Sequence, residues 1–275
     1  MKKRSGRWST AVLVLLLVMG LSLLLYPTVS DYYNSFHASR AIVSYTQQVS
    51  DLADDAYQTI FAEADRYNES LAQAMNPWQF AKDHPDEYLQ ALHVSADGIM
   101  GYIDIPVIDV YLPVYHTTSE GVLQVGVGHI EGTSLPVGGK GTHTVLSGHR
   151  GLPSARLFTD LDKLVEGDTF LLHILDETLT YQVDQILIVE PEDVSALEIQ
   201  PDQDLCTLVT CTPYGINSHR ILVRGHRIET AAQTPQVRVT GDAIQVEPVI
   251  VAVALAVPVL LMLLAAVLIT TGKRR

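Results

Sequence analysis

Two apolar runs near the ends of the chain constrain its fold more than any other feature. Residues 11–26 are apolar apart from Gly20 and Ser22, and residues 248–269 carry no charge. A run of about 20 apolar residues can cross a bilayer, and the second run meets that length. Basic residues flank both runs on the terminal side, which favours cytoplasmic ends. They are Lys2, Lys3, Arg4 and Arg7 before the first run, and Lys273, Arg274 and Arg275 after the second.

The sequence therefore predicts two membrane anchors, with the intervening segment on the extracytoplasmic side as one domain. Each run has an alternative interpretation. The first lies between the length of a signal-peptide core and that of a full span, so cleavage is the alternative; Thr28, Val29 and Ser30 offer only a poor cleavage site, and we favour an uncleaved anchor. The alternative for the second run is a buried core helix, which a charge-free stretch before a basic C-terminus disfavours.

The segment between the two anchors is strongly acidic. It contains all 31 Asp and Glu residues but only eleven of the 18 Lys and Arg residues, which gives a formal charge of −20. Nucleic acids and anionic lipids are bound by basic surfaces, so we expect no nucleic-acid partner. An amine-bearing or basic partner fits this charge better, although a solvated acidic face is the commoner explanation.

Only one of the two cysteines is placed to react. Cys211 ends a short β-branched run that begins at Thr207, and the turn-forming residues 212–215 follow it, so its thiol should lie at a strand end. Cys206 is five residues earlier, about 16 Å away along an extended chain, whereas bridging requires less than about 7 Å. The odd spacing sends the two thiols to opposite faces of the strand. We therefore expect two free thiols, with Cys211 the reactive one.

Two further residues are candidates for chemistry with Cys211. Arg220 leads into the next predicted strand, so its guanidinium can lie beside the thiol across a hairpin, where a fixed cation favours thiolate and stabilises an oxyanion. His149 follows another short strand and is placed as a general base. His219 is a rival base because it is close to Cys211 in sequence. A metal site from His129, His143 and His149 lacks any short ligand spacing, so we expect no metal and no cofactor.

Several motifs resemble the class C, pilus-assembling sortases. They are Gly-His-Arg-Gly at residues 148–151, Thr-Leu-Val-Thr-Cys at residues 207–211 with Thr-Pro-Tyr-Gly after it, His-Arg at residues 219–220, and two longer stretches at residues 129–139 and 157–162. The resemblance covers roughly residues 100–228, with several motifs in the same order and spacing. It implies a closed, mostly antiparallel β-barrel with Cys211, His149 and Arg220 at one end.

The predicted domain organisation places this barrel between helical and membrane segments. The parts are an N-terminal signal anchor (1–30), a helical region with a lid (31–98), the sortase barrel (99–230), a linker (231–247) and a C-terminal anchor (248–275). In the helical region, apolar residues recur every three or four positions as one amphipathic stripe over residues 41–71, which should pack against the barrel. A proline at position 77 should break the helix, because it disfavours α geometry in the residue before it.

The resemblance also implies a lid at Asn76, Pro77 and Trp78, where class C sortases usually carry Asp-Pro-aromatic. By that resemblance Trp78 covers Cys211 and residue 76 faces Arg220. Asn76 cannot form the carboxylate–guanidinium pair of the family, and its hydrogen bond to a guanidinium is weaker. Asp83 and Asp86 are the nearby carboxylates that could substitute for it. The alternative is that Trp78 is a core residue at a helix end.

The resemblance implies that Cys211 attacks the Thr-Gly bond of an LPXTG-like sorting signal and that a pilin lysine then takes the acyl group. Three other functions are alternatives: a purely hydrolytic cysteine peptidase, a non-catalytic pilus scaffold, and a housekeeping sortase that attaches proteins to cell-wall peptide. A papain-like hydrolase needs an acceptor to orient its histidine, and arginine has none. A scaffold would tolerate loss of Cys211, His149 or Arg220, yet all three are present. The second anchor and the lid-like segment favour class C over the housekeeping type.

Overall fold

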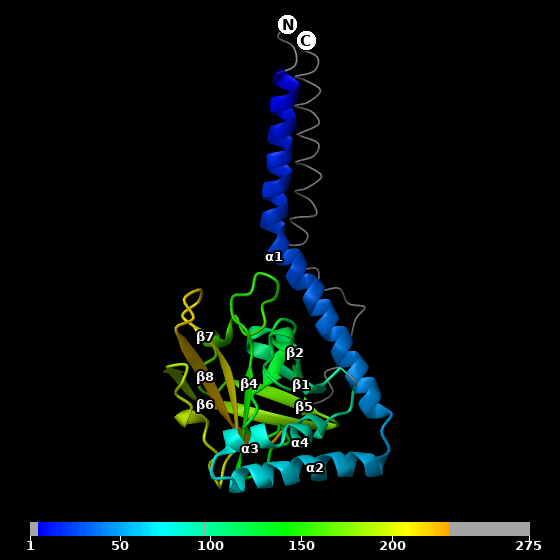
Figure 1. Ribbon diagram of the computed structural model, residues 1–275, viewed down its shortest axis with the longest axis vertical. Helices are drawn as coiled ribbons and strands as arrows, with labels where there is room; N and C mark the ends of the chain where they lie inside the picture. Colours follow the sequence, from blue (N-terminus) through cyan, green and yellow to red (C-terminus); the bar gives the residue numbers. More distant parts are fainter. Residues whose placement is uncertain (1–4, 96, 231–275) are drawn as a thin grey trace. The chain divides into compact units, whose positions relative to one another are not determined.

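The computed structural model describes residues 5–95 and 97–230, and its central element is a closed β-barrel (Figure 1). The strand order around the barrel is β1-β2-β3-β4-β7-β8-β6-β5, and β5 pairs with β1 to close it. The pairs β2/β3 and β4/β7 are parallel and the others antiparallel, so the predicted barrel is confirmed. The strands are β1 (Ile99–Ile105), β2 (Val110–Tyr115), β3 (Val127–His129), β4 (Thr142–Ser147), β5 (Thr169–Ile174), β6 (Glu177–Val189), β7 (Asp204–Thr212) and β8 (His219–Ile228).

The strands of the barrel bury side chains on both of their faces. Leu208 of β7 and Val223 of β8 are paired and belong to the main core inside the barrel. Val209 and Leu222 are also paired, and they belong to a second, smaller cluster. Because successive side chains of a strand point to opposite faces, this second cluster lies on the outer wall of the barrel.

Four helices precede the barrel, and they correct one prediction. They are α1 (Ser5–Ser50), α2 (Asp54–Gln73), α3 (Pro77–Asp83) and α4 (Pro85–Gln90). The stripe predicted over residues 41–71 does pack against the core, through Tyr45 and Val49 on α1 and Tyr67 and Leu71 on α2. It is not one helix, however, since the chain leaves α1 after Ser50 and re-enters helix at Asp54. Ser and Asp cluster at this break, and their side chains favour helix ends over helix interiors.

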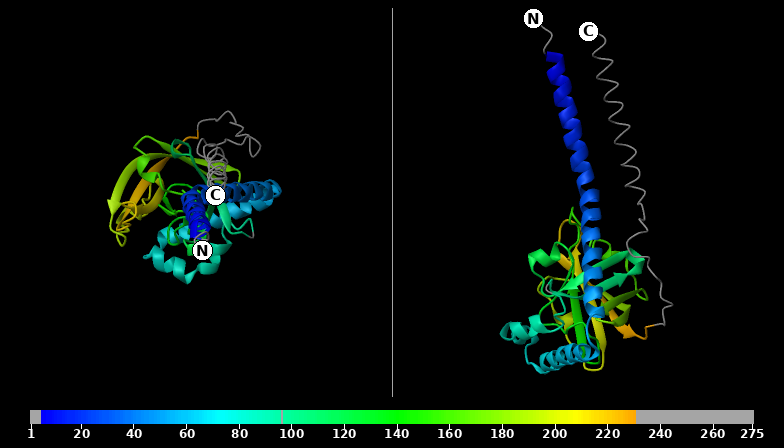
Figure 2. Two further views of the ribbon diagram at one scale, coloured as in Figure 1. Left: turned by 90° about the horizontal axis from the view of Figure 1, so that it is seen from above. Right: turned by 90° about the vertical axis from the view of Figure 1, so that its right-hand side faces the viewer.

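Short elements complete the described fold. One short helix, α5 (Glu120–Leu123), precedes β3, and three 3₁₀ turns connect longer elements: η1 (Pro106–Ile108), η2 (Leu161–Lys163) and η3 (Ser195–Leu197). Helices α2, α3 and α4 gather at one end of the barrel, the lower end in Figure 1 and in the right-hand view of Figure 2. The turn between β7 and β8 lies at the other end, at the upper left of Figure 1.

Among the described helices, one is long and apolar enough to cross a membrane. It covers Val14–Ser50 of α1, and its apolar 18-residue window has a mean hydropathy of 1.8 with none of the window buried. A signal sequence near an N-terminus meets the same criteria of length and hydropathy. The chain divides into two units, and Ser30 begins the unit that contains the barrel. The predicted linker and second anchor, residues 231–275, lie outside the described residues, so the two-anchor topology stays a prediction.

Candidate active site

The structure brings Cys211 and Arg220 together. They are direct partners in the antiparallel pairing of β7 with β8, next to the turn that joins these strands. Directly opposed residues of an antiparallel pair point to the same face, with Cβ atoms about 4.5–5.5 Å apart. Both side chains are partly exposed. A fixed guanidinium therefore lies beside an accessible thiol, as the hairpin in the sequence predicts.

The Arg220 guanidinium is held by backbone carbonyl oxygens. Its Nη1 donates to the carbonyl oxygens of His219 (3.1 Å) and Asn217 (3.3 Å). Within residues 5–95 and 97–230, no carboxylate lies within ion-pair distance of it. Since a guanidinium has five N–H donors in a fixed fork, several remain for a developing oxyanion or a peptide carbonyl.

His149 lies where the chain leaves β4 alongside β7. Ser147 pairs with Val209, Gly148 N donates to Val209 O (3.1 Å), and the Thr210 hydroxyl donates to Gly148 O (2.7 Å). Because the chain continues in this parallel register, the backbone of His149 lies level with that of Cys211 on the neighbouring strand. Its side chain is partly exposed, as are those of Cys211 and Arg220. The structure thus places all three predicted catalytic residues at one end of three adjacent strands.

The sequence did not predict a set of contacts that Arg150 makes beside this site. Arg150 pairs with Asp162 (2.5 Å), its Nη1 donates to the Thr212 hydroxyl (3.4 Å), and its guanidinium lies 5.8 Å from the ring centre of Tyr214. It therefore ties the residue after His149 to the residues after Cys211. The Gly-His-Arg-Gly motif contained this arginine, but only the fold shows which segments it joins.

Cys206 is buried in the barrel core, and burial raises the pKa of its thiol well above the usual range. Both cysteines are free, as predicted. Because a neutral thiol is a poor nucleophile, the environment of Cys206 does not favour reaction. Cys211 is partly exposed to solvent and is the cysteine that lies opposite Arg220 in the strand pairing.

The rival histidines are engaged elsewhere. His219 is opposite Thr212 rather than Cys211, and its Nε2 lies 3.2 Å from Glu190. His143 bonds to the Thr207 hydroxyl and to a backbone carbonyl, and burial lowers its pKa. Among the residues that the structure describes, no group of three or more potential ligands could hold a metal ion.

The predicted lid residues lie at the far end of the outer wall. The Asn76 side chain accepts a hydrogen bond from Gln79 N (3.1 Å) and so caps α3, with Pro77 at its first position. In the described structure Asn76 makes no bond to Arg220. Trp78 packs on Gly132, where an added Cβ would lie 2.6 Å from the indole, so only glycine fits there. Helix α3 and the β7–β8 turn are at opposite ends of the barrel (Figure 1), so the structure does not bring Trp78 to Cys211.

An apolar strip on the outer wall connects these two ends. It comprises the small outer cluster and the partly buried side chains around it, and we name it the outer strip. On β7 and β8 its members lie two residues from Cys211 or Arg220, and on β6 they lie opposite Arg220 or Leu222 in register, so they share the face of Cys211 and Arg220. Its members are Val145, Val209, Leu222, Leu187, Val189, Ile130, Ala196 and Leu197, with Trp78 packed against them.

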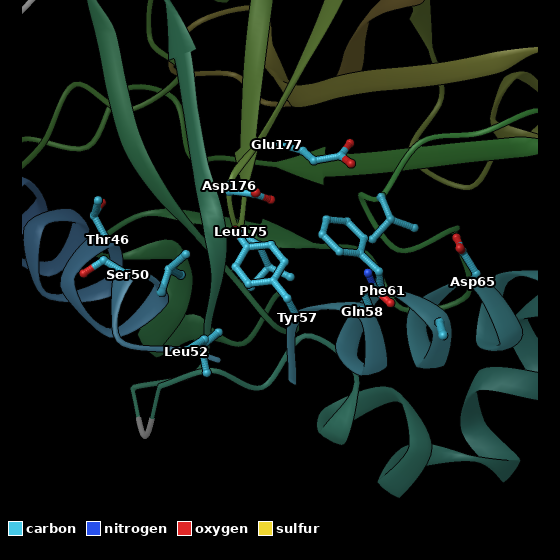
Figure 3. A pocket seen from close by; sticks show the side chains of 13 residues that line it. Thr46, Ser50, Leu52, Tyr57, Gln58, Phe61, Asp65, Leu175, Asp176 and Glu177 are labelled. Carbon is cyan, nitrogen blue, oxygen red and sulfur yellow. The ribbon is translucent and has the colours of Figure 1, made fainter. Parts of the chain in front are cut away.

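A cavity of about 1000 Å³ lies away from this site (Figure 3). It is formed by the end of α1, by α2 and by the turn between β5 and β6, with Tyr57, Phe61, Asp65, Asp176 and Glu177 in its lining. None of Cys211, His149 or Arg220 lines it. The candidate chemistry is therefore on the outer wall of the barrel and not in this cavity.

A cysteine paired with an arginine at the end of such a barrel, with a histidine on the adjacent strand, is the kind of candidate site that a cysteine-dependent enzyme would have. The family model "Sortase domain" matches residues 103–228. Sortase C1 of Streptococcus agalactiae is 50% identical with a TM-score of 0.68, and the match covers 70% of this chain and 100% of that one. The chain belongs to the sortase family, which consists of cysteine transpeptidases, and its structural relatives place it in class C.

Two further crystal structures are similar. Sortase C of Clostridium perfringens with the C-terminal cell wall sorting motif is 44% identical with a TM-score of 0.62, and the match covers 70% of this chain and 99% of that one. A sortase C of Streptococcus pneumoniae, described for its catalysis and pilin substrate specificity, is 44% identical with a TM-score of 0.61 over the same shares.

Proposed function

We propose that this sortase cleaves an LPXTG-like sorting signal between Thr and Gly and joins the acyl group to a pilin lysine, so that pili are polymerised at the membrane. The observation that carries the proposal is the pairing of Cys211 with Arg220 at one end of the outer strip. The similarity to structures that concern a cell wall sorting motif and pilin specificity supports the substrate class.

The reaction follows from the three groups. Cys211 as thiolate attacks the threonine carbonyl, and Arg220 donates to the oxyanion or to the adjacent peptide backbone. His149 then gives a proton to the leaving glycine amine, which leaves an acyl-enzyme. The lysine amine of the next subunit transfers a proton to His149 and attacks the thioester, so that an isopeptide bond forms, the Cys211 thiolate is released and His149 is again protonated.

The outer strip gives the sorting signal a place to bind. An extended peptide laid along it places apolar residues upstream of the scissile bond against the partly exposed Leu187 and Val189 of β6, while its threonine reaches Cys211. Each side chain fully buried in this way contributes about 1.5–3 kcal/mol. The charge of the domain also suits a basic acceptor.

The test is to incubate the full chain in proteoliposomes with a sorting-signal peptide and a candidate pilin, and to identify the products by mass spectrometry. We expect an amide between the peptide threonine and a pilin lysine. A peptidoglycan-type amine used in preference to pilin would instead indicate the housekeeping function, and release of the free acid alone would indicate a hydrolase.

We propose that the lid acts on the outer strip rather than on the thiol. The position of Trp78 against the strip supports this role. We expect Trp78→Ala to lower the KM for the sorting-signal peptide several-fold, because the far end of the strip is then open, and to leave the alkylation rate of Cys211 by a small thiol reagent unchanged. Gln79→Ala, on the exposed side of α3, is the control. Faster alkylation in Trp78→Ala would show that the indole covers Cys211 itself, as the class C resemblance implies.

We propose that both termini are cytoplasmic. The basic residues outside each apolar run support this topology. A reporter that works only in the cytoplasm should be active when fused to either end of the chain, and a reporter that works only outside should be inactive. A membrane-impermeant thiol reagent should label Cys211 on intact cells. An externally accessible C-terminus would contradict the arrangement with two anchors.

A further inference from the structure

The loop after β4 carries His149 and is closed by its own hydrogen bonds. Phe158 N donates to His149 O (3.1 Å), and Gly151 N donates to the Thr159 hydroxyl (3.2 Å). An isolated bridge pairs Leu152 with Ala155 within the loop. A displacement of the middle of this loop is therefore transmitted to the backbone of His149.

Helix α1 holds the middle of that loop through two side chains. The Asp31 carboxylate accepts from Arg156 N (2.7 Å), and Asn34 Nδ2 donates to Ser154 O (2.9 Å). The two residues are three positions apart, so they lie on the same face of the helix. Asp31 and Asn34 both bond to backbone groups of the loop. These bonds therefore fix the position of the loop backbone and do not depend on the loop side chains.

The same face of α1 is anchored to the barrel further along. Ala38 and Ile42 are buried, and the Tyr45 hydroxyl donates to Met100 O (2.9 Å) and accepts from Leu175 N (2.8 Å). The segment from Asp31 to Tyr45 thus connects the barrel core with the His149 loop. Figure 1 shows this part of α1 beside the loop that follows β4.

We propose that Asp31 and Asn34 are positioning residues for His149. This inference rests on the proposed role of His149 in proton transfer. Because proton transfer depends on the placement of the imidazole within hydrogen-bond reach of the reacting groups, release of the loop slows the chemical step more than it weakens peptide binding.

The two positions allow a sharp test, because Asp and Asn are nearly the same shape and only one of them has a donor. Asp31→Asn keeps an oxygen that accepts from Arg156 N, so we expect kcat near that of the unchanged protein. Asn34→Asp removes the donor and sets a carboxylate against Ser154 O, so we expect kcat to fall about 10-fold, as in Asp31→Ala. The KM for the peptide should stay within about twofold, and the pH profile of kcat should shift.

Controls separate positioning from general effects of charge or stability. Ser39→Asp adds a carboxylate to the exposed side of α1 and should leave kcat and its pH profile unchanged. The thermal midpoint of each full-chain variant is measured alongside, since a purely structural role would lower that midpoint without changing the pH profile.

Wild-type kcat and pH profile in both Asp31→Ala and Asn34→Asp would overturn the inference, as would equal losses in Asp31→Asn and Asp31→Ala. His149→Ala distinguishes this failure from failure of the proposed function. If His149→Ala is inactive while Asp31→Ala is normal, only the positioning role is wrong. If His149→Ala retains full activity, the catalytic assignment itself is wrong.

Discussion

Replacing Cys211, His149 or Arg220 with alanine should each lower transpeptidation at least about 1,000-fold while the barrel remains folded. The nucleophile, the proton carrier and the oxyanion donor act as a unit, so loss of any one removes most of the rate enhancement. Arg220→Lys should recover little, because an ammonium lacks the planar fork of a guanidinium. The measurement is the rate of amide formation between a sorting-signal peptide and an amine, with circular dichroism to verify folding.

Cys206→Ala is the matched control for this prediction. Cys206 is in the same strand but inside the barrel, and its replacement should leave the turnover rate within about twofold even if the protein becomes somewhat less stable. Trapping of a thioester on Cys211 in the Arg220→Ala variant would show that the arginine accelerates the second step more than the first. Activity that survives in Cys211→Ala but is lost in Cys206→Ala would reverse the assignment of the nucleophile.

The free energy of unfolding should fall by about 3 kcal/mol between pH 6.5 and pH 4 because of His129 alone. This ring is fully buried, its Nδ1 lies 3.0 Å from the Tyr88 hydroxyl and its Nε2 lies 2.8 Å from Ser134 O. Burial lowers its pKa from 6.5 to about 4. Below pH 6.5 the unfolded chain takes up a proton that the folded protein does not, so each pH unit in this window costs about 1.4 kcal/mol.

Urea unfolding of the full chain at a series of pH values measures this slope. The pKa of His116 and of His143 is lowered in the same direction, so they add to the slope. In His129→Gln the contribution of His129 to the pH dependence of the free energy of unfolding should disappear. Because this variant is also expected to be less stable at pH 7, the slopes of the free energy against pH are compared, and not its values at one pH. An unchanged slope in His129→Gln, or a His129 ring that titrates near 6.5 by NMR, would contradict the prediction.

The parts of the site that the sequence predicts are those that depend on local patterns. Cys211 and Arg220 are separated by a turn between two β-branched runs, and such a hairpin leaves few possible registers. The reactive thiol could be chosen over Cys206 because side chains alternate along a strand. The barrel itself followed from the motifs that resemble sortases, since the order of its strands is not visible in a local pattern.

The remaining features depend on contacts between distant segments. Asp31 meets Arg156 across 125 positions of the chain, and Arg150 braces the site through Thr212 and Asp162. Side-chain bonds to a distant backbone leave no periodicity that a sequence could show. The sequence did not predict the helix break after Ser50 for another reason. The apolar stripe of α1 continues on α2, so the spacing of its apolar residues is that of one helix.

The barrel keeps its chemistry on the outside, and this affects the size of the molecules that it can process. Its interior is filled with side chains, while the thiol and the guanidinium face outward beside a strip that continues along the wall. In the proposed function a substrate tail docks from the side, and the folded body to which the tail belongs does not have to enter the enzyme. In the proposed function the growing pilus would leave in the same way, so that its length is not limited by passage through a pore.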